Sequence, residues 1–403
     1  ISMVREFDVV VVGAGPIGGY LSRRFNEHGN SVLMIEEHDQ LGRPFQCAGL
    51  VNPESMRTIG LEDTILTTIW GANIHSPTGT RVTIGDPSIP RTFSVCRKLF
   101  DESVVMQSIA TGTELLLSTK PYLARVNDDF VQVKIDGPNG DETIHCKLLC
   151  GADGAHSWVR RNFRMGNPRE TMIGFQIEVS GYKGDSGMLD MYTGKNISPG
   201  FFSWAIPTGD TTRVGTWTKT ELMNGLSSEQ YLDRLLQDQQ INSRFEKCSE
   251  VARFCGPVPS GIVRKPLIER VALFGDAAGV CKPTTGGGIG PGFKQVDLLV
   301  PRLSKCMEDN ELSRGTMNSI SSLLKEMARN QRKKRALRDA FLTEMSDTEL
   351  EGIFDVWARP EVTDLINEFG DIENPIPLGI KMLREVPEFR RLAGRAAKAV
   401  LWG

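Results

Sequence analysis

The chain has 403 residues, of which 40% are hydrophobic and 24% are charged, and its formal net charge at pH 7 is −3. This composition excludes a disordered or fibrous protein, and the length predicts about two or three packed units. A net charge so close to zero gives no electrostatic footprint for nucleic acid, so no nucleic-acid partner is expected.

Membrane spans and disulfides are not expected either. No apolar run approaches the roughly 18 residues that cross a bilayer. The eight cysteines are scattered without a CxxC pair, and a chain of this length needs no disulfide framework. We therefore expect a cytoplasmic protein in a reducing compartment, without a metal site.

The first forty residues predict a strand, a glycine-rich turn, a helix and a second strand. Residues 7–12 form a β-branched run typical of a strand buried in a parallel sheet. The motif GAGPIG follows at residues 13–18, and apolar residues then recur at helical spacing to about Gly29. Residues 31–35 form the next strand, which ends at Glu36. This order is typical of a Rossmann-like βαβ unit.

Two stretches farther along carry strand-like segments broken by Gly and Pro turns. Residues 65–95 and 168–260 are predicted to build one antiparallel sheet. Between them, residues 100–110 predict a helix, and residues 130–149 predict a hairpin.

A short buried strand over 271–274 then precedes a helix from about Gly288, and helical patterns dominate from Arg302 onward. The expected fold class joins α/β and α+β architecture: a Rossmann-like dinucleotide-binding domain, an antiparallel-sheet substrate domain and a C-terminal helical region. Their expected ranges are 1–64, 96–167 and 265–300 for the first, 65–95 and 168–264 for the second, and 301–403 for the third.

GAGPIG fits the GxGxxG pattern of dinucleotide sites. Its first glycine permits a tight turn, the second lets a diphosphate approach the backbone, and the third lets helix and strand pack closely. The acid after the second strand suits ribose hydroxyls and argues against a 2′-phosphate, which favours FAD or NAD over NADP. An incidental glycine-rich turn is the alternative. The cofactor-binding residues expected from this unit are Gly13, Gly15, Ile17, Gly18, Glu36 and Glu37.

A second glycine-rich segment points to FAD. Asp276 follows a strand in LFGDAA, where its carboxylate can bind ribityl hydroxyls, although a plain strand-end turn would give the same letters. The sequence KPTTGGGI over 282–289 then opens a helix, and its amides can face N1 and O2 of an isoalloxazine. The expected binding residues are Gly275, Asp276, Gly287, Gly288 and Ile289.

With these two motifs, the chain resembles the para-hydroxybenzoate-hydroxylase-like flavoproteins. Their central DG motif is matched by Asp153 and Gly154 in GADGAHSWVR. Arg97 matches the arginine that this group places near the FAD phosphates, a solvated arginine at a helix start being the alternative. The resemblance implies that Arg97, Ala124 and Asp153 bind FAD.

Two further segments resemble the geranylgeranyl reductases within this group. GRPFQCAG over 42–49 is similar to that family's proline-x-x-cysteine segment, and PGFFSWAIP over 199–207 is similar to its YxWxFP motif. The likeness covers roughly residues 5–300. Phe202 replaces the tyrosine, Ile206 replaces the phenylalanine, and GTW at 215–217 replaces GxG, so the segment also approaches the WxWxIP of flavin-dependent halogenases.

Cys47 and the aromatic residues are the candidates for the reaction site. The resemblance implies that Cys47 and Ala48 lie beside the flavin, with Cys47 as the candidate catalytic residue; a small buried hydrophobe is the alternative. An aromatic-lined cavity would suit a long hydrocarbon and exclude water, although each ring alone could be core. The expected substrate-pocket residues are Tyr192, Phe201, Phe202, Trp204, Pro207 and Trp217.

The resemblance implies an FAD-dependent reductase that saturates carbon–carbon double bonds of geranylgeranyl chains, in archaeal membrane-lipid precursors, by hydride transfer from flavin N5. An external electron donor (ferredoxin, NAD(P)H or deazaflavin) and an isoprenoid lipid are the implied partners. The first alternative is an FAD monooxygenase or halogenase of the same fold. The second is a non-catalytic flavin- or lipid-binding protein.

The C-terminal segment bears on membrane contact. Residues 387–402 predict a helix with an apolar and a basic face, which can lie at an anionic membrane surface. A terminal helix packed on the protein is the alternative.

Overall fold

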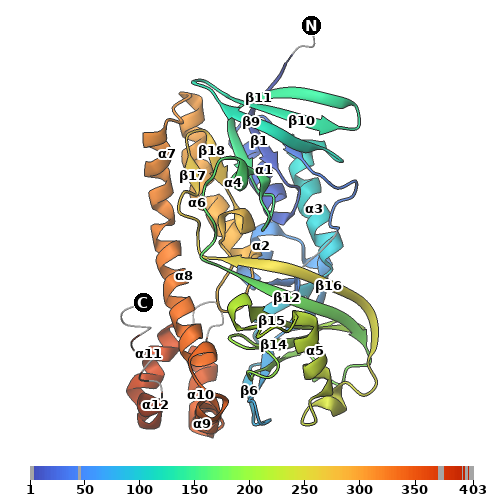
Figure 1. The fold of residues 1–403 in the computed structure, drawn as a ribbon, viewed down its shortest axis with the longest axis vertical. Helices are drawn as coiled ribbons and strands as arrows, with labels where there is room; N and C mark the ends of the chain where they lie inside the picture. The colour runs from blue at the N-terminus through green and yellow to red at the C-terminus, as the bar shows by residue number, and fades with distance from the viewer. Residues whose placement is uncertain (1–3, 44–46, 371–375, 393, 395–397, 399–403) are drawn as a thin grey trace.

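The structure, a computed structural model, describes residues 4–43, 47–370, 376–392, 394 and 398. Within this part of the chain, an eight-stranded sheet has the order β17-β18-β11-β1-β2-β8, and β10 and β9 continue it from β11 (Figure 1). Strands β18, β11, β1, β2 and β8 are parallel. The bounds are β1 Arg5–Val12, β2 Val32–Ile35, β8 Glu114–Leu116, β9 Lys120–Val126, β10 Val131–Gly137, β11 Gly140–Gly151, β17 Leu267–Ile268 and β18 Val271–Leu273.

Helices pack on this sheet and bury its β-branched strands. Val9, Val10 and Val11 of β1 are fully buried, as the continuous apolar run predicts for a central parallel strand. Residues of α1, α3 and α6 share one core cluster with β1 and β2. The predicted βαβ unit, the hairpin β10–β11 and the helix after Gly288 are confirmed. The helix bounds are α1 Pro16–Glu27, α2 Pro53–Ile59, α3 Arg97–Ala110, α4 Trp158–Asn162 and α6 Ile289–Glu308.

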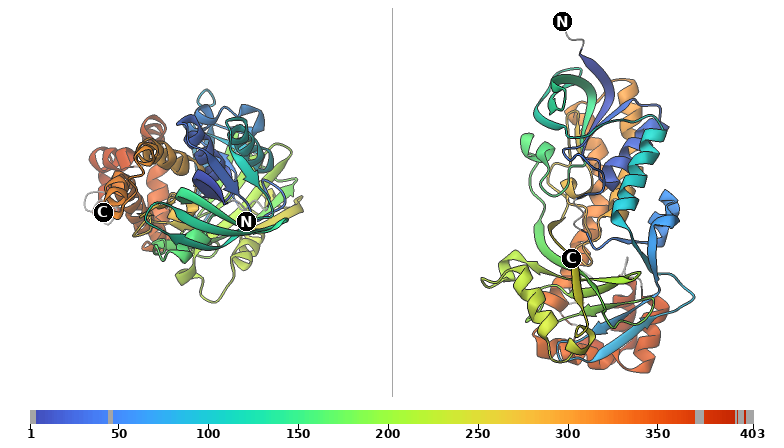
Figure 2. Two further views of the ribbon diagram at one scale, coloured as in Figure 1. Left: turned by 90° about the horizontal axis from the view of Figure 1, so that it is seen from above. Right: turned by 90° about the vertical axis from the view of Figure 1, so that its right-hand side faces the viewer.

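A seven-stranded sheet in the order β16-β12-β15-β14-β13-β5-β6 lies at the other end of the molecule (Figure 2). The prediction that two separated stretches share one sheet is confirmed. Helix α5 packs on β12 and β15. The bounds are β5 Gly71–His75, β6 Arg81–Gly85, β12 Glu170–Ser180, β13 Met188–Tyr192, β14 Ser203–Thr208, β15 Thr211–Lys219, β16 Ser249–Ser260 and α5 Ser228–Gln237.

Two details of that prediction are wrong. Strands β5 and β13 pair in parallel. They come from two separated stretches of the sequence, so no hairpin connection forces them to be antiparallel. Residues 65–69 and 92–95, which form β4 (Ile65–Ile69) and β7 (Thr92–Val95), leave this sheet and join β3 (Leu50–Val51) in a three-stranded sheet.

The rest of the described chain is helical, as predicted. Helix α8 runs along the side of the molecule from the larger sheet toward the smaller one, and α10 contacts β6 (Figure 1). The bounds are α7 Arg314–Ser321, α8 Lys325–Arg338, α9 Asp347–Trp357, α10 Pro360–Phe369, α11 Ile376–Glu385 and α12 Pro387–Leu392, with short turns of 3-10 helix at Glu62–Thr64, Thr220–Leu222, Asn242–Arg244, Gly275–Ala278 and Ser322–Leu324 and a π-helical turn at Asp339–Thr343.

None of the helices in the described part of the chain combines the length and apolar character needed to cross a bilayer. Phe389, on the apolar side of the predicted surface helix, is only 3% exposed and packs among the C-terminal helices. Glu388 pairs with Arg359 at 3.0 Å. Residues 387–392 therefore behave as a packed terminal helix, and most of the remaining segment lies outside the described residues.

Candidate functional site

The three glycines of the first motif differ in what surrounds them. Gly13 has a φ of +102°, and a Cβ there would lie 2.4 Å from the Ala152 carbonyl oxygen. A Cβ at Gly18 would lie 1.9 Å from the carbonyl oxygen of Gly13. Gly15, the N-cap of α1, has nothing within 4 Å of such a Cβ and leaves the helix start without a side-chain cap. This open helix N-terminus suits a diphosphate.

Glu36 braces the same turn. One carboxylate oxygen accepts from the Ala14 amide at 2.8 Å, and the other accepts from the His38 amide at 3.0 Å. Glu36 is thereby held at the end of β2, beside the glycine turn. Glu37 is exposed and pairs with Lys120 at 3.5 Å, so the structure does not bring Glu37 to the turn.

The DG motif lies directly against the first glycine motif. A Cβ at Gly13 would lie 2.9 Å from the Asp153 Cα, and the Ala152 amide donates to the Val12 carbonyl at 2.8 Å. Asp153 accepts hydrogen bonds from Ser157 and, at 3.1 Å, from the Val159 amide, while burial raises the pKa of its carboxyl. The ends of β1 and β11 therefore place both motifs at one edge of the sheet.

Ile17 joins this edge to the second glycine segment. Gly275 has a φ of +62°, and a Cβ there would lie 3.0 Å from the Ile17 side chain. A Cβ at Gly292, in the first turn of α6, would lie 2.3 Å from Ile17. Gln295 accepts from the Gly275 amide and donates to the Leu273 carbonyl, both at 2.9 Å. These contacts dock α6 and the GD turn on the start of α1.

Two ionisable side chains, Arg97 and Asp276, lie at this junction. Arg97 is 8% exposed and makes a bidentate ion pair with Asp101 at 2.9 and 2.7 Å, so it is not the solvated arginine of the alternative. Although burial opposes its charge, Asp101 raises the pKa of Arg97, with smaller contributions from Cys47 and Asp276. Burial raises the pKa of Asp276, against a 3.0 Å hydrogen bond from the Cys281 thiol.

The segment of residues 282–288, named here the ring loop, is closed by its own backbone. The Gly286 amide donates to the Lys282 carbonyl at 2.8 Å, and the Lys282 amide donates to the Gly287 carbonyl at 3.1 Å. Among the described residues, the hydroxyls of Thr284 and Thr285 are buried without a hydrogen-bond partner. Gly288 is the N-cap residue of α6 and supplies no side-chain cap, and a Cβ there would lie 2.9 Å from an Asp276 carboxylate oxygen.

This donor set fits FAD. The open start of α1 suits the diphosphate, Glu36 suits a ribose, and Asp276 suits the ribityl chain. The free amides of α6 and the two orphaned threonine hydroxyls offer hydrogen bonds to a polar ring edge such as that of an isoalloxazine. Sequence reasoning missed the threonines, although they lie inside the KPTTGGGI motif, and it missed Gln295, for which no spacing signal exists.

Cys47 and Ala48 lie near the same junction. The Cys47 sulfur accepts from the Gly49 amide at 3.4 Å, and Arg213 donates to the Ala48 carbonyl at 2.8 Å. Cys47 also lies near Arg97 and Cys281. Residues 44–46, which include the proline of the proline-x-x-cysteine segment, lie outside the described residues.

Four of the predicted pocket aromatics pack together beside Cys281, the residue before the ring loop. Phe201 stacks on Phe202 with ring centroids 4.5 Å apart, and Trp204 meets Trp217 edge-on at 4.9 Å. They share a buried cluster with Cys281. We call Phe201, Phe202, Trp204 and Trp217 the aromatic face.

Three other predicted residues lie elsewhere. Tyr192 stacks on His75 at 4.5 Å and packs in a different cluster, with α5, so it is not brought to the aromatic face. The Pro207 carbonyl, at the end of β14, accepts from Ser94 at 2.6 Å. Ala124 is buried in β9, in the core cluster that also holds Val12 and Ile35, and its carbonyl accepts from Asn162 at 3.3 Å.

Comparison with known proteins assigns the chain to a family. The family model described as "FAD binding domain" matches residues 6–311. Digeranylgeranylglycerophospholipid reductase of Methanocaldococcus jannaschii is 26% identical over 86% of this chain and 89% of its own length. A geranylgeranyl bacteriochlorophyll reductase-like protein from Thermoplasma acidophilum has a TM-score of 0.85 at 20% identity, over 98% of this chain and 100% of that chain.

The flavin-dependent brominase Bmp2 has a TM-score of 0.72 at 16% identity, over 90% of this chain and 92% of that chain. At identities this low, the two structural likenesses show a shared fold. The expected fold class, the FAD cofactor and the resemblance to geranylgeranyl reductases are confirmed. The family model covers most of the chain, and the glycine motifs of the chain come together as an FAD site requires. The chain therefore belongs to the FAD-binding domain family and is an FAD-dependent oxidoreductase.

Proposed function

We propose that the protein uses FAD to saturate carbon–carbon double bonds in geranylgeranyl chains of archaeal membrane-lipid precursors. The observation that carries this proposal is the contact between the aromatic face and the ring loop. Trp217 lies on Gly286, and the aromatic face shares its cluster with Cys281. The name of the M. jannaschii relative, a digeranylgeranylglycerophospholipid reductase, supports the same substrate class.

The ring loop is suited to hold a flavin that accepts negative charge. When bound, FAD supplies hydride transfer from N5. The uncapped start of α6 presents free amides, and a helix N-terminus stabilises negative charge nearby. Burial raises the pKa of the Cys281 thiol, so at neutral pH its proton stays on sulfur and points at Asp276.

The aromatic face is proposed to orient the alkene and to exclude water from the reaction site. An isolated alkene is a weak electrophile, so alignment in a site without water must provide much of the acceleration. Phe201, Phe202 and Trp217 are each less than a tenth exposed, and their rings offer a hydrocarbon chain mostly apolar surface. Trp204 anchors the face by donating its indole N–H to Gln176 at 3.0 Å.

Cys47 is proposed to steer the flavin or the substrate, since it lies near Arg97 and Cys281 at the junction of the glycine motifs. We likewise propose that the aromatic face lines the substrate pocket, that the chain divides into three domains, and that the two glycine motifs contact the cofactor. The electron donor is proposed to be external: a ferredoxin, NAD(P)H or a deazaflavin. Peripheral contact with a membrane is proposed because the substrate is a lipid.

An anaerobic single-turnover experiment tests the function. The FAD-loaded protein is photoreduced, geranylgeranyl phospholipid is added, and flavin absorbance is followed together with lipid mass. Flavin reoxidation with a gain of H₂ per reduced bond is expected. The brominase likeness raises the alternative of a halogenase or monooxygenase. That alternative would leave the flavin reduced until O₂ is admitted and would yield a halogenated or hydroxylated product.

A further inference from the structure

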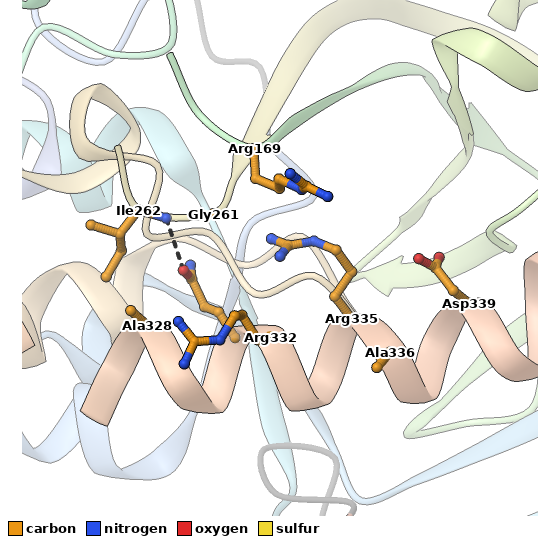
Figure 3. A pocket seen from close by; sticks show the side chains of 9 residues that line it. Arg169, Gly261, Ile262, Ala328, Arg332, Arg335, Ala336 and Asp339 are labelled. Carbon is orange, nitrogen blue, oxygen red and sulfur yellow. Dashed lines mark hydrogen bonds between the residues drawn. The ribbon is translucent and has the colours of Figure 1, made fainter. Parts of the chain in front are cut away.

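A groove of about 520 Å³ lies along α8, and its lining contains none of the residues assigned above to the flavin site (Figure 3). The end of β16, the segment before β12 and one side of α8 form its walls. The lining residues are Arg169, Gly261, Ile262, Ala328, Gln331, Arg332, Arg335, Ala336 and Asp339.

The groove carries more positive than negative charge. Arg335 shares Glu170 with Arg338, at 3.0 and 2.8 Å, and Lys219 and Arg338 both hold Asp339. Arg169 and Arg332 make no ion pair with any described carboxylate. Both are exposed, and their charges are therefore available to a ligand in the groove.

Backbone geometry allows two of the arginines to converge. Gly261 has a φ of +96°, and a Cβ there would lie 2.3 Å from the Arg169 Cβ and 2.9 Å from a guanidinium nitrogen of Arg335. Figure 3 shows Arg335 reaching from α8 toward Arg169 across this glycine. A larger residue at 261 would separate the two side chains. Paired guanidinium groups with fixed forks are suited to phosphate oxygens.

Helix α8 joins the groove to the back of the ring loop. Gln331 accepts from the Ile262 amide at 3.0 Å and donates to the Gly279 and Cys281 carbonyls at 3.0 and 3.1 Å. Arg338 donates to the Pro283 carbonyl at 2.7 Å and lies 6.0 Å from the Phe201 ring centroid. Arg335 is less than one turn of α8 from Arg338, so the groove ends close to the aromatic face.

We propose that this groove binds a phosphate group through Arg169, Arg332 and Arg335. The phosphate belongs to a lipid headgroup or to a small soluble phosphate compound. The phosphate site itself does not depend on the proposed function. Only the headgroup source rests on it, because a lipid with its phosphate in the groove would send its chain toward the aromatic face.

Titration of the FAD-loaded protein with inorganic pyrophosphate, followed by calorimetry, tests the site. Arg169→Gln and Arg332→Gln remove cations that hold no described carboxylate, so the fold should persist, as the flavin spectrum will report. Each is expected to weaken pyrophosphate binding about 10-fold. Arg329→Gln is the matched control, since Arg329 is an exposed cation of α8 outside the groove. Equal binding by all variants, or no binding to the unaltered protein, would overturn the proposal.

Steady-state assays separate the two sources. A headgroup site predicts that Arg169→Gln and Arg332→Gln raise KM for geranylgeranyl phospholipid but leave KM for geranylgeraniol unchanged. A site for a soluble phosphate compound predicts lost pyrophosphate binding with both KM values unchanged. If no isoprenoid is reduced at all, the proposed function fails while the pyrophosphate titration still decides the site.

Discussion

The indole of Trp217 covers Gly286 so closely that a Cβ atom at this glycine would lie 1.5 Å from the ring. The contact joins two segments separated by about seventy residues of chain, the aromatic face and the ring loop. It requires glycine twice over, because Gly286 also has a φ of +71°. The geometry of the proposed reaction site therefore depends on this pair.

Gly286→Ala is expected to displace Trp217 and to lower both stability and FAD affinity. The left-handed φ alone costs roughly 1–2 kcal/mol for alanine, and overpacking adds about 1–3 kcal/mol. Gly209→Ala is the matched control, since Gly209 has a φ of +77° and open space around it. Urea unfolding with and without FAD measures both costs; equal losses in the two variants would contradict the role of the contact.

The first glycine motif should separate folding from cofactor binding. Gly18→Ala is expected to prevent folding, because its Cβ would lie 1.9 Å from the Gly13 carbonyl oxygen. Gly15→Ala has free space and should fold with a stability change of about 0.5 kcal/mol or less, yet lose at least about 10-fold in FAD affinity. Circular dichroism and FAD titration give the two readouts. Unchanged FAD affinity in Gly15→Ala would place the diphosphate elsewhere.

Arg97 can be tested apart from its ion pair. Arg97→Gln leaves the buried Asp101 carboxylate without its cation, which should destabilise the fold by about 3–5 kcal/mol. The double variant Arg97→Gln/Asp101→Asn removes the stranded charge and should recover most of that stability. If Arg97 also serves the cofactor, the double variant still binds FAD about 10-fold more weakly. Full recovery of FAD affinity would make Arg97 purely structural.

The stability of the FAD-free protein should depend on pH through Asp276. Burial raises the folded-state pKa of Asp276 above its unfolded value, so the folded state binds the proton more tightly. This contribution is fully present below the unfolded pKa and is lost as pH rises through the folded pKa. At pH 7, the Asp276→Asn variant should therefore unfold at a higher urea concentration than the unaltered protein. The difference between the two urea midpoints should become smaller toward pH 4. A difference in urea midpoints that grows toward acid pH would contradict the expected direction of this pH dependence.

Cys47 is tested by paired substitutions. Cys47→Ser keeps the size of the side chain and Cys47→Ala removes its polar atom, and both should slow anaerobic lipid saturation while FAD remains bound. Cys248 is a suitable control, because it lies in the cluster beneath α5, away from the ring loop. Saturation at full rate in both Cys47 variants would show that its place near Arg97 and Cys281 has no part in the reaction.

The sequence by itself determined the parts of the site that short segments encode. Residues 7–36 contain a β-branched run, three glycines, an amphipathic helix and an acid in this order. Local sterics favour the strand–turn–helix–strand arrangement that the structure shows. The glycines of the second segment and the helix after Gly288 are local in the same sense. These signals sufficed for the cofactor and the family.

Tertiary structure alone decided which residues meet. Tyr192 and Trp204 lie on neighbouring strands, but side chains alternate across a sheet, so pairing register sends Tyr192 to the cluster beside α5 and Trp204 to the aromatic face. The parallel pairing of β5 with β13 and the bracing of the ring loop by Gln331 likewise join distant segments. Such contacts form by packing between segments that are far apart in the sequence, and the amino-acid sequence has no periodic pattern that indicates them.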